Sequence, residues 1–124
     1  MEFFSEVTNN RVTAGKLFEL LTIASLPEFC ASIDKVISLR SSTEGEIYCV
    51  WGQFTISREK IRNGVRFALL NCPHAVAWTV TVHEQRGVVG IHCTIDKKDE
   101  EREFVESIEK FVAEWADGLA GKLL

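Results

Sequence analysis

The chain has 124 residues, 46% of them apolar, which suffices for one globular domain with a substantial core but leaves no room for a second. Its 14 basic and 18 acidic residues leave a net charge of −4, too small a bias to indicate nucleic acid or an anionic membrane surface as a partner. The N-terminal residues contain neither a basic segment nor an apolar run of the length that a signal peptide or a membrane span needs. We therefore expect a single cytoplasmic domain over residues 1–124, with no nucleic-acid and no membrane partner.

The first forty residues predict a strand, two short helices and a second strand. Residues 3–8 predict the first strand, and Thr13 is placed to cap the first helix. Residues 25–28 have the S-x-x-E spacing of a capping box with proline in the first turn, which predicts the start of the second helix. Both the helical and the strand period fit residues 34–40. We favour a break near Asp34 followed by a strand.

The middle of the chain predicts antiparallel strands. Residues 47–56 are rich in β-branched and aromatic side chains, so we predict one long strand there, with Gly52 as a bulge. Asn63-Gly64 is the strongest hairpin signal in the sequence and is predicted to join this strand to another over residues 65–70.

Residues 76–95 contain the clearest alternating pattern and predict a hairpin with its turn at residues 84–87. One face of this hairpin is predicted to be core and the other largely solvated. The opposite face is the more polar one, with Thr79, Thr81, His83 and His92. The apolar face pairs Val76 with Ile95, Trp78 with Cys93, Val80 with Ile91, and Val82 with Val89.

The last segment, residues 96–119, predicts a long amphipathic helix. Its largest apolar residues recur at helical spacing, and Asp96 or Asp99 is the expected N-cap. Gly118 and Gly121 are expected to mark its end. The stripe needs an apolar surface about five turns long, and the preceding sheet is the only candidate. The stripe consists of Phe104, Ile108, Phe111, Trp115 and Leu119, widened by Val105, Val112 and Ala116.

Four cysteines and three histidines suggest metal or nucleophilic chemistry, but their spacing argues against both. The cysteines form no C-x-x-C pair, and His92 and Cys93 are adjacent in a predicted strand and so point to opposite faces. We expect no metal site and no cofactor, and we read the cysteines as buried apolar residues in a reducing compartment. Glu106 and Lys110 are expected to form a solvated helical pair.

A basic run from Arg58 to Arg66 carries Arg58, Lys60, Arg62 and Arg66. It suits either a phosphate or acidic partner, or a solvated turn whose charges blunt pairing at a strand edge. We favour the solvated turn, because the run has no aromatic platform comparable to that of single-strand binders.

The predicted order is an α+β fold, with an antiparallel sheet wrapped on a long C-terminal helix and two short helices after the first strand. This order resembles the START-like helix-grip fold of the SRPBCC superfamily. The resemblance spans the chain. It rests on residues 3–7, 17–21, Leu26-Pro27-Glu28 with Ile33, Val36 and Leu39, Trp78 in a strand, and the helix from Phe104 to Leu119.

The resemblance implies a pocket between sheet and helix for an apolar small molecule. Our first hypothesis is a non-catalytic domain that binds a small apolar or amphipathic ligand there. Bulky residues on the inner faces would alternatively fill this space and leave a scaffold. A homodimeric interaction module of chaperone type is the second hypothesis, with the polar sheet face or an unpaired strand edge as its contact surface. A cyclase or hydrolase of SRPBCC type is the third. The residues expected to line the ligand space are Trp78, Val80, Ile91, Cys93, Phe111 and Trp115.

Overall fold

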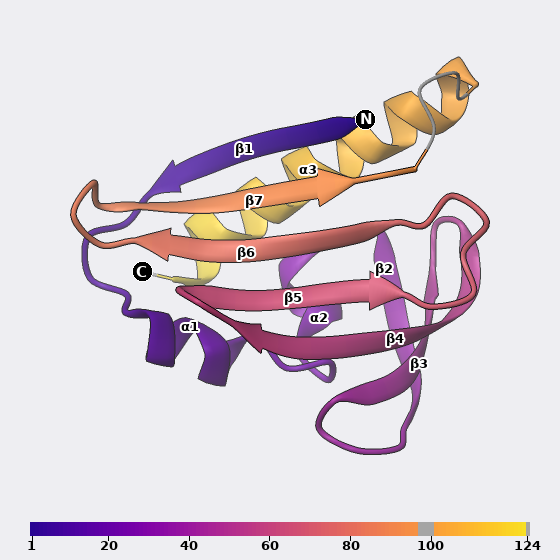
Figure 1. Ribbon diagram of the computed structural model, residues 1–124, viewed down its shortest axis with the longest axis horizontal. Helices are drawn as coiled ribbons and strands as arrows, with labels where there is room; N and C mark the ends of the chain where they lie inside the picture. Colours follow the sequence, from indigo (N-terminus) through magenta and orange to yellow (C-terminus); the bar gives the residue numbers. More distant parts are fainter. Residues whose placement is uncertain (97–100, 124) are drawn as a thin grey trace.

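A computed structural model describes residues 1–96 and 101–123 and shows a curved antiparallel sheet wrapped on a long helix (Figure 1). Seven strands in the described part of the chain follow the order β1-β7-β6-β5-β4-β3-β2. Strands β2 to β7 thus form a meander, and β1 pairs with β7 at its far end. This arrangement confirms the predicted α+β fold. The strands are β1 (Glu2–Thr8), β2 (Ile33–Leu39), β3 (Glu44–Cys49), β4 (Gly52–Ile61), β5 (Gly64–Leu69), β6 (Ala77–His83) and β7 (Val88–Thr94), and the helices are α1 (Ala14–Leu20), α2 (Leu26–Phe29) and α3 (Arg102–Lys122).

The helices cover the inner face of the sheet, and the core lies between the two layers. Helix α3 packs against β1, β7 and α2, while α1 packs against β5 and β6. Figure 1 shows α3 running behind β1 and β7 along most of their length. Most of the predicted stripe of α3 is buried, with Ile108, Phe111 and Trp115 fully enclosed, whereas Phe104 near its start is half-buried. Each large side chain of this kind contributes about 2 kcal/mol before the entropy of ordering is subtracted.

The β6–β7 hairpin has the predicted register. Trp78 faces Cys93, Val80 faces Ile91, and Val82 faces Val89. These six side chains are at most 2% exposed, so the alternating pattern identified the core face correctly.

Helix α3 begins and ends later than its capping residues suggested. It starts at Arg102 with Glu101 at the N-cap, so Asp96 does not cap it, and Asp99 lies outside the described residues. The helix also continues through Gly118 to Lys122, because Leu119 and Leu123 are buried and hold its last turn on the core. Within the described residues, no helix has the combined length and hydropathy that crossing a membrane requires.

The long strand predicted over residues 47–56 is wrong. Strand β3 ends at Cys49 and β4 begins at Gly52, and the two residues face each other across a tight turn. Gly52 has a φ of 120°, a conformation that residues with a Cβ rarely adopt, so it serves the turn and is not a bulge. The turn directs Trp51 onto α3, where its indole nitrogen donates to the Ser107 hydroxyl at 2.8 Å.

The next hairpin lies where Asn63-Gly64 predicted it, but its turn residues are Arg62 and Asn63. Ile61 pairs with Gly64, and Asn63 adopts a φ of 67°, which asparagine tolerates better than most residues. The favoured strand over residues 35–40 is also confirmed, because β2 covers Ile33–Leu39.

The two short helices are capped differently from each other. The Thr13 hydroxyl accepts from the Lys16 N–H at 3.2 Å, as predicted for α1. The capping box predicted for α2 does not form. Instead, the Ser25 hydroxyl donates to the Leu20 carbonyl at 2.8 Å and accepts from the Thr22 N–H at 3.1 Å, so it secures the connection between the helices.

The basic run is the solvated turn that we favoured except at Arg58, which lies in the core. Its side chain faces inward from β4 and is buried, with Nε donating to the Leu21 carbonyl at 2.7 Å. Its guanidinium also donates to the Phe18 carbonyl and lies 3.8 Å from the centroid of the Phe18 ring. Arg62 and Arg66 remain exposed.

Candidate ligand site between the sheet and the long helix

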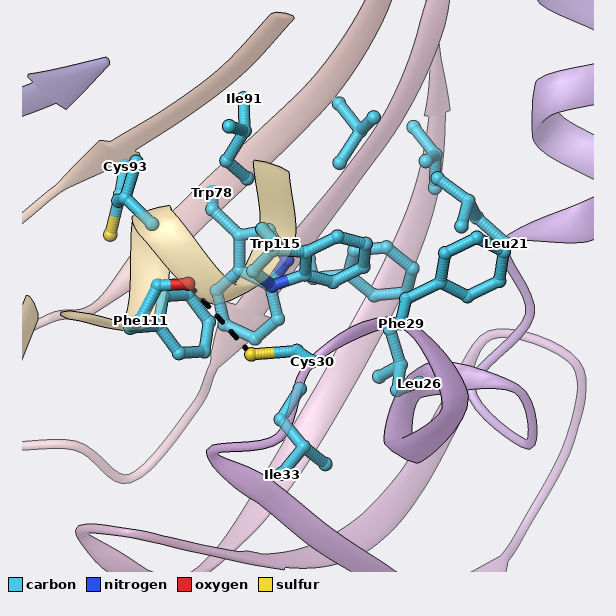
Figure 2. Packing of buried hydrophobic residues seen from close by; sticks show 14 of the residues in the cluster. Leu21, Leu26, Phe29, Cys30, Ile33, Trp78, Ile91, Cys93, Phe111 and Trp115 are labelled. Carbon is cyan, nitrogen blue, oxygen red and sulfur yellow. Dashed lines mark hydrogen bonds between the residues drawn. The ribbon is translucent and has the colours of Figure 1, made fainter. Parts of the chain in front are cut away.

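The six residues predicted to line a ligand space lie together beneath α3. Strand β6 supplies Trp78 and Val80, β7 supplies Ile91 and Cys93, and α3 supplies Phe111 and Trp115. Each is at most 1% exposed. Figure 2 shows the rings from α3 facing the side chains of the two strands.

Aromatic rings fill most of the space between these elements by direct contact. The Trp78 centroid lies 4.9 Å from that of Phe111, edge to face, and 6.3 Å from that of Trp115. Phe29 of α2 stacks on Trp115 at 6.0 Å, and Phe67 of β5 stacks on Trp78 at 5.6 Å. Any ligand held here must therefore lie between rings that now touch.

Phe67 and Phe29 were both missing from the predicted set. The position of Phe67 follows from the strand register, because it pairs with Trp78 across β5 and β6. The alternation of Val65, Phe67 and Leu69 carries that signal in the sequence. Phe29 reaches Trp115 only because α2 packs against α3, a contact that local sequence does not encode.

Two polar groups of the cluster lack a partner. The indole N–H groups of Trp78 and Trp115 are buried, and neither has a hydrogen-bond acceptor among the described residues. Buried tryptophans usually find an acceptor, and an unsatisfied donor costs about 1–3 kcal/mol. Trp51, by contrast, donates to Ser107. The centre of the core thus holds two free donors in apolar surroundings.

A surface hollow of about 480 Å³ lies at the seam between α2 and α3, and Phe29 separates it from Trp115. The Glu114 carboxylate at its rim accepts from the Ser32 hydroxyl, and Cys30 lies just inside, with Sγ 3.8 Å from the Phe111 carbonyl oxygen (Figure 2). The rim is acidic, which favours neutral or cationic groups there. The hollow is lined by Pro27, Glu28, Phe29, Ala31, Glu114, Asp117 and Gly118.

The thiols near the site are poor nucleophiles. Burial raises the pKa of Cys30 to about 12, and burial likewise raises the pKa of Cys93 to about 12. The thiolate is the reactive form, so both are almost wholly unreactive at neutral pH. His92 lies on the other face of the sheet and pairs with Glu2 at 2.8 Å. In residues 1–96 and 101–123, no three potential metal ligands of the His, Cys, Asp and Glu types converge.

Solved structures share this architecture. XoxI from Bacillus cereus aligns with a TM-score of 0.70 at 13% identity, over 95% of this chain and 92% of that one. An uncharacterised protein from Bacillus thuringiensis aligns with a TM-score of 0.65 at 16% identity, over 97% and 94%. A START superfamily protein from Mycobacterium smegmatis aligns with a TM-score of 0.63 at 12% identity, over 98% and 93%.

The fold is the START-like helix grip. No protein-family model matches the sequence, and no curated protein does. Sequence identities of 12% to 16% establish a shared fold and nothing about the function of this chain.

Proposed function

We propose that the protein binds a small, mainly apolar molecule between the sheet and α3, without catalysis. The observation that best supports this is the pair of unsatisfied indole N–H groups of Trp78 and Trp115. A ligand that carries a hydrogen-bond acceptor satisfies these donors, while the surrounding rings bury its apolar part. The high pKa values of the neighbouring thiols support a binding role over a nucleophilic one.

In this proposal, the ligand enters through the hollow between α2 and α3. The Phe29 ring lines this hollow and stacks on Trp115. Phe29 belongs to α2, a helix of four residues. Displacing so short a helix breaks few backbone hydrogen bonds. Glu28, Glu114 and Asp117 at the rim disfavour a ligand that carries a carboxylate.

The test compares three matched probes by NMR, namely a long-chain methyl ketone, the alkane of equal length and the corresponding carboxylate. The chain has three tryptophans, and therefore three indole N–H resonances. We expect the ketone to shift the resonances of Trp78 and Trp115 downfield, with little change at Trp51, whose N–H is already bonded to Ser107. The alkane and the carboxylate should bind at least about tenfold more weakly, the worth of one hydrogen bond or one unfavourable charge.

Trp78→Phe and Trp115→Phe keep a ring in place and remove one donor each. We expect each variant to lose most of the preference for ketone over alkane, while Trp51→Phe keeps it. The proposal fails if none of the probes shifts the Trp78 or Trp115 resonance, or if the ketone and the alkane bind equally to the wild-type protein. Either result would leave the aromatic cluster as a packed core alone.

A further inference from the structure

The sheet has two edge strands, and only one of them is built to resist pairing. Strand β2 has two register shifts against β3, between Ile33 and Lys35 and between Val36 and Ser38. Bulges of this kind twist an edge and block the addition of another strand. Strand β1 pairs with β7 over all seven of its residues without a shift. Its edge is therefore regular.

The hydrogen-bond pattern shows which backbone groups point away from β7. Met1 and Ile95 exchange both of their backbone bonds at 3.0 Å, and the Asn9 N–H donates to the Gly87 carbonyl at 2.8 Å. Bonded pairs alternate along an antiparallel ladder, so the odd-numbered residues of β1 bond to β7. The N–H and C=O groups of Glu2, Phe4 and Glu6 therefore face the open edge.

A groove lies along this edge, between β1 and α3. One hollow of about 270 Å³ is lined by Phe3, Phe4 and Ser5 from the strand and by Glu109, Val112 and Ala113 from the helix. A second hollow of about 320 Å³ continues past the end of the strand, lined by Thr8, Asn9, Asn10, Arg11, Ala120 and Leu123. Figure 1 shows β1 and α3 running in roughly the same direction. The lining residues put the first hollow beside the first half of β1 and the middle of α3, and the second beside the ends of both elements.

Side chains at the edge define the chemistry of a strand that would fit. The outer side chains of β1 are Glu2, Phe4 and Glu6, and Phe4 is 59% exposed. Glu2 pairs with His92 at 2.8 Å and Glu6 with Arg86 at 3.0 Å, so a basic residue of an added strand competes with these two side chains for the carboxylates. The inner wall combines apolar Val112 with the carboxylate of Glu109, which forms no ion pair among the described residues. An added strand alternates its side chains between these two surroundings. Basic residues suit the outer positions, and small apolar residues suit the groove.

We infer that β1 accepts an extended segment of a partner protein, with alternating basic and small apolar residues, as an additional strand beside α3. Main-chain bonds to Glu2, Phe4 and Glu6 provide the affinity, and the alternation provides the specificity. A second copy of this chain is a poor occupant. In an antiparallel pair of β1 strands centred on Phe4, Glu2 of each copy would face Glu6 of the other, and like charges directly opposite are destabilising.

The test uses a peptide of alternating lysine and valine with both ends capped. A capped peptide of alternating glutamate and valine is the matched control. We expect the lysine peptide to move the amide resonances of Glu2, Phe4 and Glu6 downfield and to slow their hydrogen exchange. The amides of Phe3 and Ser5, already bonded to β7, should change less. The glutamate peptide should bind at least about tenfold more weakly. Absence of shifts in β1 at millimolar lysine peptide overturns the inference.

Two pairs of variants separate strand addition from simple charge attraction. Phe4→Pro removes the N–H at the open edge, a position where proline is tolerated, and should weaken binding about tenfold or more. Phe4→Val keeps that N–H and should bind like the wild type. Glu109→Lys should weaken binding, while Glu59→Lys on β4 makes the same change of charge away from the groove and should have little effect.

Equal binding by the Phe4→Pro and Phe4→Val variants would show that main-chain pairing plays no part, and would overturn the inference. If Phe4→Pro does not fold, the exchange rates of the edge amides in wild-type protein decide the same question. Concentration-dependent dimers that the lysine peptide does not dissociate would assign the edge to a second copy instead, which also contradicts the inference. The Trp78 and Trp115 variants leave this edge intact, so the proposed ligand site is tested separately.

Discussion

Arg58 is the residue whose role departs most from what its type suggests. The last carbonyls of a helix have no partner within it, and at the end of α1 the guanidinium takes those of Phe18 and Leu21. Among the described residues, Arg58 is the donor bonded to the Leu21 carbonyl, and no backbone N–H outside the helices and strands reaches it. Burial lowers the pKa of Arg58 from its ordinary value, yet arginine stays charged in proteins. The side chain therefore ties α1 to the sheet.

Replacing this side chain should be costly. We expect Arg58→Met to lower the free energy of unfolding by about 2–4 kcal/mol, because it removes the donor from one buried and one partly buried carbonyl. Lys60→Met is the matched control, since the Lys60 ammonium lies 5.5 Å from the Phe18 centroid but the residue is exposed. Its effect should stay within about 0.5 kcal/mol. Urea denaturation measures both, and a similar small effect of the two changes would refute this role of Arg58.

Part of this arrangement was predictable from residue types. Alternation places Arg58 on the same face of β4 as Ile56, an apolar residue that is fully buried in the core. The acceptors, however, belong to a helix far away in the sequence. The predicted exposure of the basic run is therefore correct for Lys60, Arg62 and Arg66 and wrong for Arg58 alone.

At the scale of elements, the contact between α2 and α3 depends on a missing side chain. A Cβ added at Gly118 would lie well inside van der Waals distance of the Phe29 carbonyl oxygen. The sequence suggested that Gly118 ends the helix, whereas the structure uses it inside the helix to let two backbones approach. This close approach also sets the stacking of Phe29 on Trp115.

Replacing Gly118 with alanine distinguishes the effect of backbone packing on stability from the effect of helix propensity. Gly118→Ala should lower the free energy of unfolding by about 1–3 kcal/mol through steric overlap, despite the higher helix propensity of alanine. Gly121→Ala is the matched control on the same helix, since a Cβ there would have no neighbour within 4 Å. That change should stabilise by about 0.5–1 kcal/mol. Stabilisation by both changes in thermal or chemical denaturation would rule out the close contact.

The element boundaries show where local signals reach their limit. The hydrophobic periods of α3 and of the β6–β7 hairpin are long and identified both elements and their buried faces. Short signals were less informative. The turn at Val50 and Trp51 carries no typical turn residue before Gly52, and the spacing of a capping box was present at Ser25 without the bonds. Tertiary contacts, namely Trp51 with Ser107 and Ser25 with Leu20, decided these positions.

For the whole molecule, the order of elements was enough to predict a helix grip, while the pairing of β1 with β7 was not expected. That pairing places the first strand beside the last strand and makes β1 the sheet edge next to α3. The six candidate site residues came together because strand register and helix period were both clear. The lack of a hydrogen-bond acceptor for the indole N–H groups of Trp78 and Trp115 could not be predicted, because it depends on which acceptors the complete fold brings near them.

Because two thiols are buried in the core, the free energy of unfolding depends on pH in the alkaline range. Burial raises the pKa of Cys30 and of Cys93 from 9.0 to about 12 in the folded protein. Below pH 9.0 both thiols are protonated in the folded and unfolded states, so their contribution to stability is fully present. Above it the unfolded chain loses protons that the folded protein retains. Stability therefore falls as pH rises, by up to about 1.4 kcal/mol per pH unit for each thiol.

The contribution of the two thiols can be isolated by comparing variants that differ only at cysteine positions. We expect urea denaturation in the presence of a reductant to show the wild type losing stability from about pH 9 to 10.5 more steeply than the Cys30→Ala, Cys93→Ala double variant. Cys72→Ala, at a half-buried position, should keep the slope of the wild type. Parallel slopes for the wild type and the double variant would mean that solvent reaches these thiols in the folded state. The core beneath α3 would then open far more readily than its contacts imply, and ligand entry would need no displacement of Phe29.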